Sequence, residues 1–131
     1  MATEEDLRRI ALGLPRTSEG QSYRTPSFAV AGRSFLRLRT EAEGGLVVFV
    51  PDLGEKQALL EADPDVYFTT PHYDGYPAVL VRLEAVGLAE LRELVTESWR
   101  LKAPVRLRKL FDQENGGDRS AGPGTAPPAP L

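Results

Sequence analysis

Apolar residues recur at helical spacing near both ends of this chain and at strand spacing between them. An N-terminal helix is predicted to begin after Thr3, whose side chain can cap it, and to end at Gly13 and Pro15. Its apolar positions are Leu7, Ile10, Ala11 and Leu14. A longer helix is predicted from about 88 to 101, because apolar residues return every three or four positions. Its stripe contains Leu88, Leu91, Leu94, Val95, Ser98 and Trp99, and we expect Trp99 in the core.

The middle of the chain is predicted to form strands. Residues 27–30 and 34–39 flank a tight turn at Gly32, which supplies the positive φ that a hairpin turn needs. The other predicted elements are a central strand at 46–50, a short helix at 55–61 and a strand at 79–83. This order predicts an α+β fold, an antiparallel sheet with helices packed on one face.

Composition changes after Phe111. A short helix is predicted between Pro104 and Phe111, whereas residues 112–131 are mostly Gly, Pro, Ala and polar residues. Such a segment lacks the large apolar side chains that offset the entropy of ordering. We therefore expect a single domain at 1–111 and a disordered tail at 112–131, in keeping with a length of 131 residues.

Composition excludes several classes of function. The chain has no cysteine and one histidine, which excludes disulfides, thiolate zinc sites and a multi-histidine metal site within one subunit. We expect no cofactor and no metal. An acidic N-terminus and the lack of a long apolar run indicate a cytoplasmic protein without membrane contact. We also expect a monomer. Because the net charge is −3, binding to nucleic acid would require a local basic patch.

The first candidate site is the predicted strand at 34–39. If its leucines face the helices, Phe35, Arg37 and Arg39 share the other face, with Arg33 at the hairpin tip. An aromatic ring among guanidinium groups can stack on bases while the arginines contact phosphates. The alternative is an ordinary solvated face whose arginines pair with Glu41, Glu43 or Glu84.

The second candidate is the loop at 69–77, which contains the only histidine. His72 could act as a general base or hydrogen-bond donor oriented by Asp74, with Tyr73 and Tyr76 as the wall of a pocket. No nucleophile is specified beside it, so catalysis is not the favoured interpretation. The alternative is structural, because tyrosines next to Gly and Pro often anchor loops.

The third candidate is a run of basic residues with no acidic residue between Ser98 and Phe111. A local positive patch of this kind could contact phosphate. The alternative is that cations are simply favoured at a helix C-terminus. The run contains Arg100, Lys102, Arg106, Arg108 and Lys109.

Four segments in order, Gly13-Leu14-Pro15, Thr25-Pro26-Ser27-Phe28, Thr70 to Pro77 and Ser98 to Leu101, resemble the MmcQ/YjbR family over about residues 4 to 110. The resemblance implies a compact fold similar to CyaY, described as a double wing of hairpins, and a DNA-binding role presumed for that family. Many members carry His…Asn-Lys…Trp before the strand. Here the corresponding residues are His72, Asp74 with Gly75, and Tyr76, so the loop lacks the lysine.

The leading hypothesis is a non-enzymatic DNA-binding protein. Its predicted contacts are Arg33, Phe35, Arg37 and Arg39, the five C-terminal cations, and the rings of Tyr73 and Tyr76. The rival hypothesis is a small-molecule binding module, for a drug or a metabolite, that uses His72, Tyr73 and Tyr76 as its pocket. A third possibility is a protein-interaction module that uses an exposed hairpin edge.

Overall fold

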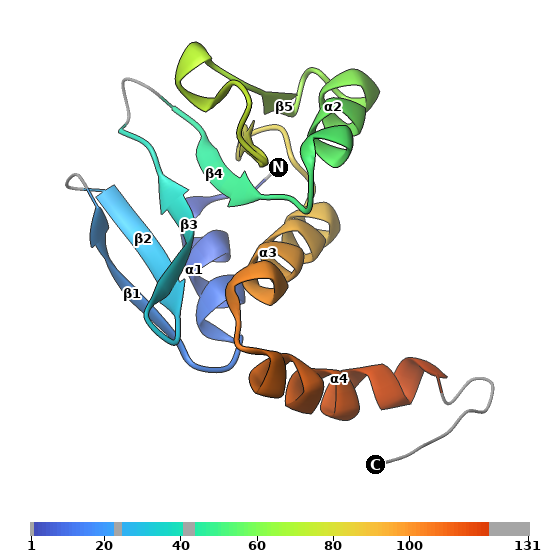
Figure 1. The fold of residues 1–131 in the computed structure, drawn as a ribbon. Helices are drawn as coiled ribbons and strands as arrows, with labels where there is room; N and C mark the ends of the chain where they lie inside the picture. The colour runs from blue at the N-terminus through green and yellow to red at the C-terminus, as the bar shows by residue number, and fades with distance from the viewer. Residues whose placement is uncertain (1, 23–24, 41–43, 121–131) are drawn as a thin grey trace.

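The computed structural model describes residues 2–22, 25–40 and 44–120, and within them an antiparallel sheet carries four α-helices (Figure 1). The six strands are ordered β1-β2-β3-β4-β6-β5. Their bounds are β1 Thr17–Ser22, β2 Thr25–Val30, β3 Arg33–Leu38, β4 Leu46–Phe49, β5 Tyr67–Phe68 and β6 Ala78–Val81. The helices are α1 Glu4–Leu12, α2 Leu53–Ala62, the short 3-10 helix η1 Pro71–Tyr73, α3 Leu88–Lys102 and α4 Val105–Ser120. This arrangement is the predicted α+β fold.

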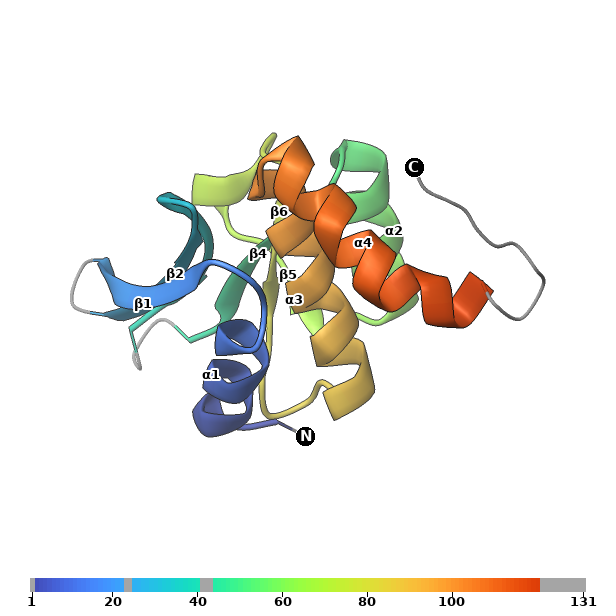
Figure 2. The same cartoon turned by 90° about the horizontal axis from the view of Figure 1, so that it is seen from below.

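One face of the sheet packs on α1 and α3, and we call it the inner face (Figures 1 and 2). Strand register places one row of apolar residues across it: Phe28, Leu36, Val48 and Val79. Leu7 of α1 and Trp99 of α3 meet this layer and are fully buried. The core therefore lies between the inner face and these two helices, which confirms the predicted position of Trp99.

Local sequence accounts for the N-terminal helix and for the hairpin. Thr3 caps α1 in a reciprocal capping box with Asp6, at 3.1 Å from the Asp6 amide to the Thr3 hydroxyl. The β2–β3 turn places Ala31 and Gly32 at positive φ, 49° and 85°, which matches the twist that a two-residue hairpin turn requires. Both predictions are confirmed.

Two strands were not predicted from the sequence. β1 consists only of Thr, Ser, Glu, Gly and Gln, so it has no apolar alternation, and β5 is two residues long. Both strands lie at the edges of the sheet. In such positions backbone pairing with a neighbouring strand stabilises the structure more than side-chain pattern does.

The last helix is longer than the predicted one. α4 continues to Ser120, beyond the predicted end at Phe111 and into the segment where a disordered tail was expected. An ion pair between Arg100 and Asp112 and a ring contact between Trp99 and Phe111 (centroids 4.9 Å apart) hold α4 against the end of α3. Residues 121–131 lie outside the described residues. Among the helices described, none is both long and apolar enough to cross a membrane.

Candidate nucleic-acid interface

Strand register defines the face of the sheet opposite α1 and α3, which we call the outer face. One row of paired residues crosses it from β1 to β5, in the order Gly20, Ser27, Arg37, Val47, Leu80 and Phe68. The β1–β2–β3 half thus carries small and polar side chains, whereas the β4–β6–β5 half is apolar. Arg37 lies at the boundary between the two halves.

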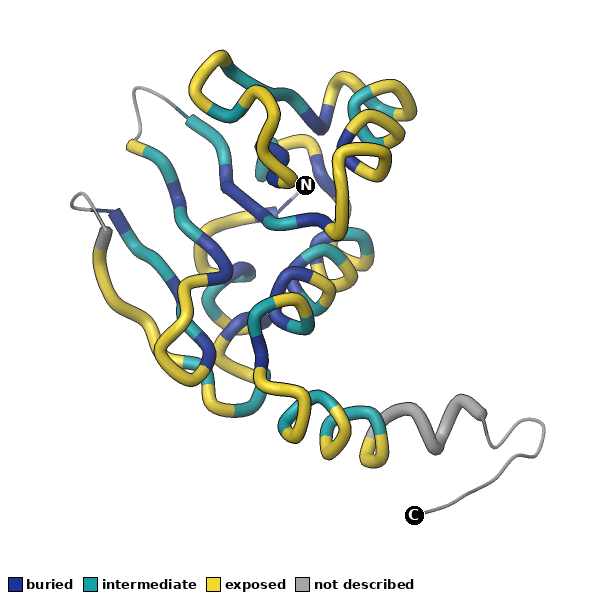
Figure 3. Tube along the Cα trace, in the orientation of Figure 1, coloured by how far each residue is buried: buried dark blue, intermediate teal, exposed yellow. Residues whose placement is uncertain are grey.

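The loop at 69–77 covers the apolar half of the outer face. Val47, Ala78 and Leu80 form a second, small core that is separate from the main one, and Phe68 and Tyr73 pack against it. The loop is mostly exposed outside these contacts (Figure 3). It therefore stands as a raised border beside the flat β1–β2–β3 half.

A hydrogen bond joins this loop to the arginine-bearing strand. The Arg37 guanidinium donates to the Tyr73 hydroxyl at 2.6 Å, across 36 positions of sequence. Arg39, which directly follows β3, donates to the Gly44 carbonyl at 3.2 Å. The first two candidate sites of the sequence analysis are thus one surface. The predicted pairing partners Glu41 and Glu43 lie outside the described residues.

Within the loop, the three predicted contact residues have different environments. Tyr73 is half-buried, whereas His72 is exposed and Tyr76 is 58% exposed. The His72 ring packs edge-on against Tyr73, with centroids 4.9 Å apart. In the described part of the chain, no hydrogen bond joins the His72 ring to Asp74, so the predicted orienting role of Asp74 is not found.

A buried lysine holds the loop, and the sequence analysis missed it. Lys56 of α2 is 6% exposed, and its ammonium group donates to the Tyr73 carbonyl at 2.6 Å and to the Tyr76 carbonyl at 3.1 Å. Lysine is rarely buried unless it has partners. The only available signal was the position of Lys56 in a short predicted helix, which gave no reason to expect burial.

Phe35 does not belong to the interface, and its prediction was wrong. Its side chain is fully buried in the main core. Phe28 pairs with Leu36 while Ala29 pairs with Ser34, so Phe35 is the extra residue of a β-bulge. A bulge breaks the strict alternation of strand side chains, which lets Phe35 and Leu36 both face the core.

The remaining predicted cations fall into two groups. Arg33 is exposed at the start of β3, but it pairs with Val30 of the main core, so strand register places it on the inner side and not beside Arg37. At the other end of the chain, Arg100 is paired with Asp112, and the Lys102 ammonium lies 4.2 Å from the centroid of the Phe49 ring. Arg106 and Lys109 are exposed on α4, whereas Arg108 is half-buried. Much of the C-terminal group is therefore engaged within the protein.

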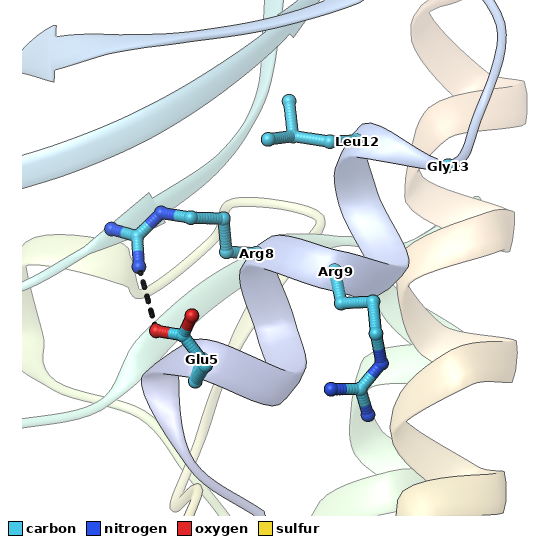
Figure 4. Close-up of a pocket in the computed structure, with 5 residues that line it drawn as sticks. All are labelled: Glu5, Arg8, Arg9, Leu12 and Gly13. Carbon is cyan, nitrogen blue, oxygen red and sulfur yellow. Dashed lines mark hydrogen bonds and ion pairs between the residues drawn. The ribbon is translucent and has the colours of Figure 1, made fainter.

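A hollow on α1 contains two arginines that could bind an anion, but both arginines already form ion pairs with carboxylates. It is lined by Glu5, Arg8, Arg9, Leu12 and Gly13 and has a volume of about 470 Å³ (Figure 4). Arg8 is bound by three carboxylates, those of Glu4, Glu5 and Glu19. Arg9 is paired with Asp6 at 2.9 Å. An anion would have to displace these partners, so we do not place the functional site there.

These α1 ion pairs predict how acid affects stability. Hydrogen bonds from the Thr3 backbone and from Arg9 hold the pKa of Asp6 below its ordinary 3.8, and a hydrogen bond from Arg8 holds that of Glu19 below 4.5. A lowered folded-state pKa contributes stability that is present above the unfolded value and is lost as pH falls through the folded one. We expect the free energy of unfolding to decrease between about pH 5 and pH 3.

The check is urea unfolding across that range. Asp6→Asn/Glu19→Gln should be less stable than wild type at neutral pH and should show a weaker dependence on pH. Glu114→Gln, an exposed carboxylate on α4, is the matched control and should keep the wild-type pH profile. An unchanged pH dependence in the double variant would contradict the assignment.

The geometry defines a small α+β protein with an arginine-bearing sheet face bordered by a tyrosine loop. A family model described as YjbR matches residues 12–101, and the chain belongs to this family. It is similar to Uncharacterized protein Rv2570 of Mycobacterium tuberculosis and Uncharacterized protein Mb2600 of Mycobacterium bovis. Each is 41% identical over 129 residues, which is 88% of this chain and 100% of the relative.

A solved structure supports the fold. The crystal structure of Deinococcus radiodurans protein DR2400, with the family-model domain DUF419, superimposes with a TM-score of 0.63 at 24% sequence identity. The match covers 88% of this chain and 82% of that one. At this identity the likeness extends to the fold alone. The resemblance to the YjbR family expected from the sequence is confirmed, and so is the α+β fold.

Proposed function

We propose that this protein binds DNA without sequence preference through the outer face of β1–β2–β3 and the adjoining loop at 69–77. The observation that carries the proposal is the hydrogen bond between Arg37 and Tyr73. It fixes a guanidinium group at the boundary of the β1–β2–β3 half, directly beside the loop that carries the exposed Tyr76 ring. Guanidinium groups contact phosphate, and an exposed aromatic ring stacks on an unpaired base.

The small side chains of the face favour close approach of a nucleic acid backbone. Ser18 and Ala29 are paired across β1 and β2, as are Gly20 and Ser27, so these paired residues place only small side chains between β1 and Arg37. The one acidic residue of β1, Glu19, bonds to Arg8 of α1. Its charge is thereby directed to the inner side of the sheet and not to the face proposed for DNA.

Phosphate contacts would make binding modest and sensitive to salt. If Arg37 and Arg39 each neutralise one phosphate, affinity should fall roughly 7- to 12-fold between about 50 and 200 mM salt. Such contacts position the backbone and carry little sequence information. The measurement is a fluorescence-anisotropy titration of single- and double-stranded oligonucleotides at both salt concentrations.

Charge reversal tests which residues are responsible. Arg37→Glu/Arg39→Glu should abolish binding to either oligonucleotide, while Arg37→Lys, which keeps the positive charge, should weaken it only moderately. Arg92→Glu is the matched control, because Arg92 is exposed on α3, on the other side of the sheet. Thermal melting of each variant verifies that it is folded. Unchanged binding by the folded double variant, or no binding by wild type at low salt, would refute the proposal.

A further inference from the structure

A second hollow lies between α2 and α3. Figure 1 shows these two helices next to each other beyond the end of β4. The hollow has a volume of about 390 Å³, which is within the range of small-molecule sites. We call it the α2–α3 groove. It is lined by Phe49, Val50, Pro51, Glu55, Leu59, Tyr67, Glu90, Glu93, Leu94 and Glu97.

All charged residues that line the groove are acidic. Glu55 is contributed by α2, whereas Glu90, Glu93 and Glu97 follow at intervals of three and four residues on α3. Like charges at this spacing repel each other and weaken a helix. Within the described residues, no three acidic or histidine side chains converge closely enough to hold a metal ion. The carboxylates therefore form a negatively charged rim in which the individual charges are separated from one another.

The base of the groove is apolar and ordered. Val50 and Tyr67 are buried, and Leu59 and Leu94 are half-buried. The Tyr67 hydroxyl donates a hydrogen bond to the Glu90 carboxylate. Burial first, and then this bond, raise the pKa of Tyr67 above its ordinary value, so the phenol keeps its proton. One carboxylate of the rim is thus held in place before any ligand arrives.

An aromatic ring of the groove wall also interacts with a cation elsewhere. The Lys102 ammonium lies 4.2 Å from the centroid of the Phe49 ring, although Lys102 itself does not line the groove. An ammonium group over an aromatic ring gains electrostatic attraction from the ring face. The contact shows that the electron-rich face of Phe49 accepts an ammonium group.

We propose that the α2–α3 groove binds a small organic cation, a protonated amine on an apolar body. The ammonium group would lie among the carboxylates of Glu93 and Glu97, and the body on Leu59 and Leu94. Charge complementarity with the rim and the size of the apolar base favour this class over an anionic or a neutral ligand. The site shares no residue with the DNA interface, so each proposal can fail without the other.

The test compares three probes with one apolar body and different charges: phenylbutylamine, phenylbutanol and phenylbutyrate. Amide NMR spectra of the full chain are recorded during titration with each probe. The amine should shift amide signals of residues 55–59 and 90–97, while the alcohol should bind at least tenfold more weakly and the acid should not bind. Equal binding of alcohol and amine, or shifts elsewhere only, would overturn the proposal.

Charge-neutral variants give the second comparison. Glu93→Gln/Glu97→Gln should weaken binding of phenylbutylamine about tenfold, since each carboxylate contributes a partly screened attraction. Glu84→Gln/Glu114→Gln removes the same charge at exposed positions outside the groove and should bind like wild type. Equal affinities of the two double variants would overturn the proposal. So would a dimer in sedimentation experiments that only the groove variant disrupts, because a second copy would then occupy the groove.

Discussion

Replacing Trp99 with alanine should destabilise the protein by about 3–5 kcal/mol, the usual cost of removing a fully buried large aromatic side chain. Trp99 is fully buried and joins three parts of the fold. Its indole N–H donates to the Pro15 carbonyl at 3.0 Å, in the connection between α1 and β1, and its ring packs on Phe111 of α4. The substitution would thus leave a cavity and remove the ring contact with α4. It would also take away one of the two hydrogen bonds to the Pro15 carbonyl, which keeps the bond from the Thr17 hydroxyl at 3.3 Å.

Trp99→Phe separates these contributions. Phenylalanine keeps most of the apolar contact but cannot donate to Pro15, so the loss should be smaller, about 1–3 kcal/mol. The measurement is urea unfolding followed by circular dichroism, because Trp99 is the only tryptophan and its fluorescence disappears in both variants. Equal losses in the two variants, or less than about 1 kcal/mol in Trp99→Ala, would show that the ring does not organise the core.

Helical periodicity predicted the position of Trp99 because α3 packs one continuous stripe against the sheet. The same kind of argument failed for Phe35, where a bulge shifts the strand by one residue and exchanges the faces. Nothing in the local pattern of Phe35-Leu36-Arg37 marks that bulge. It depends on the partner strand β2, which a reading of β3 alone does not include.

Individual residues of the candidate site were predicted from the sequence, but their proximity in space was not. Arg37 and Tyr73 were both singled out, yet they are 36 positions apart, and only the pairing of β3, β4 and β6 brings them together. Lys56 was missed because its burial results from tertiary contacts of α2 with the loop. Non-local contacts of this kind are set by topology, which a one-dimensional pattern leaves undetermined.

The outer face has two halves with separate roles, and this division connects the fold to the proposed function. In the β4–β6–β5 half, Val47 and Leu80 form a core that fixes the loop at 69–77. The outer row of the β1–β2–β3 half carries Arg37, with Arg39 just after the end of β3. The loop is therefore held from below by apolar packing, from the side by Arg37 and from α2 by Lys56. A DNA-binding surface built in this way would be fixed before the ligand arrives.

Lys56→Met should release the loop and destabilise the protein by about 1–3 kcal/mol, because two backbone carbonyls lose a charged hydrogen-bond donor. Methionine has a similar length and avoids the cost of burying an ammonium group, which recovers part of the loss. The decisive readout is therefore local. Hydrogen exchange of the Tyr76 and Ala78 amides, which bond to the Tyr73 and Tyr76 carbonyls, should accelerate more than exchange of the core strands.

Arg92→Met is the control, because Arg92 is exposed on α3 and its loss should leave both stability and loop exchange unchanged. In the DNA titration, Lys56→Met should bind more weakly than Arg92→Met even though Lys56 is too buried to reach a phosphate. That result would show that Lys56 acts by positioning Tyr73, and through it Arg37. Wild-type exchange of the loop amides in Lys56→Met would instead mean that the second core and the Arg37 hydrogen bond hold the loop without Lys56.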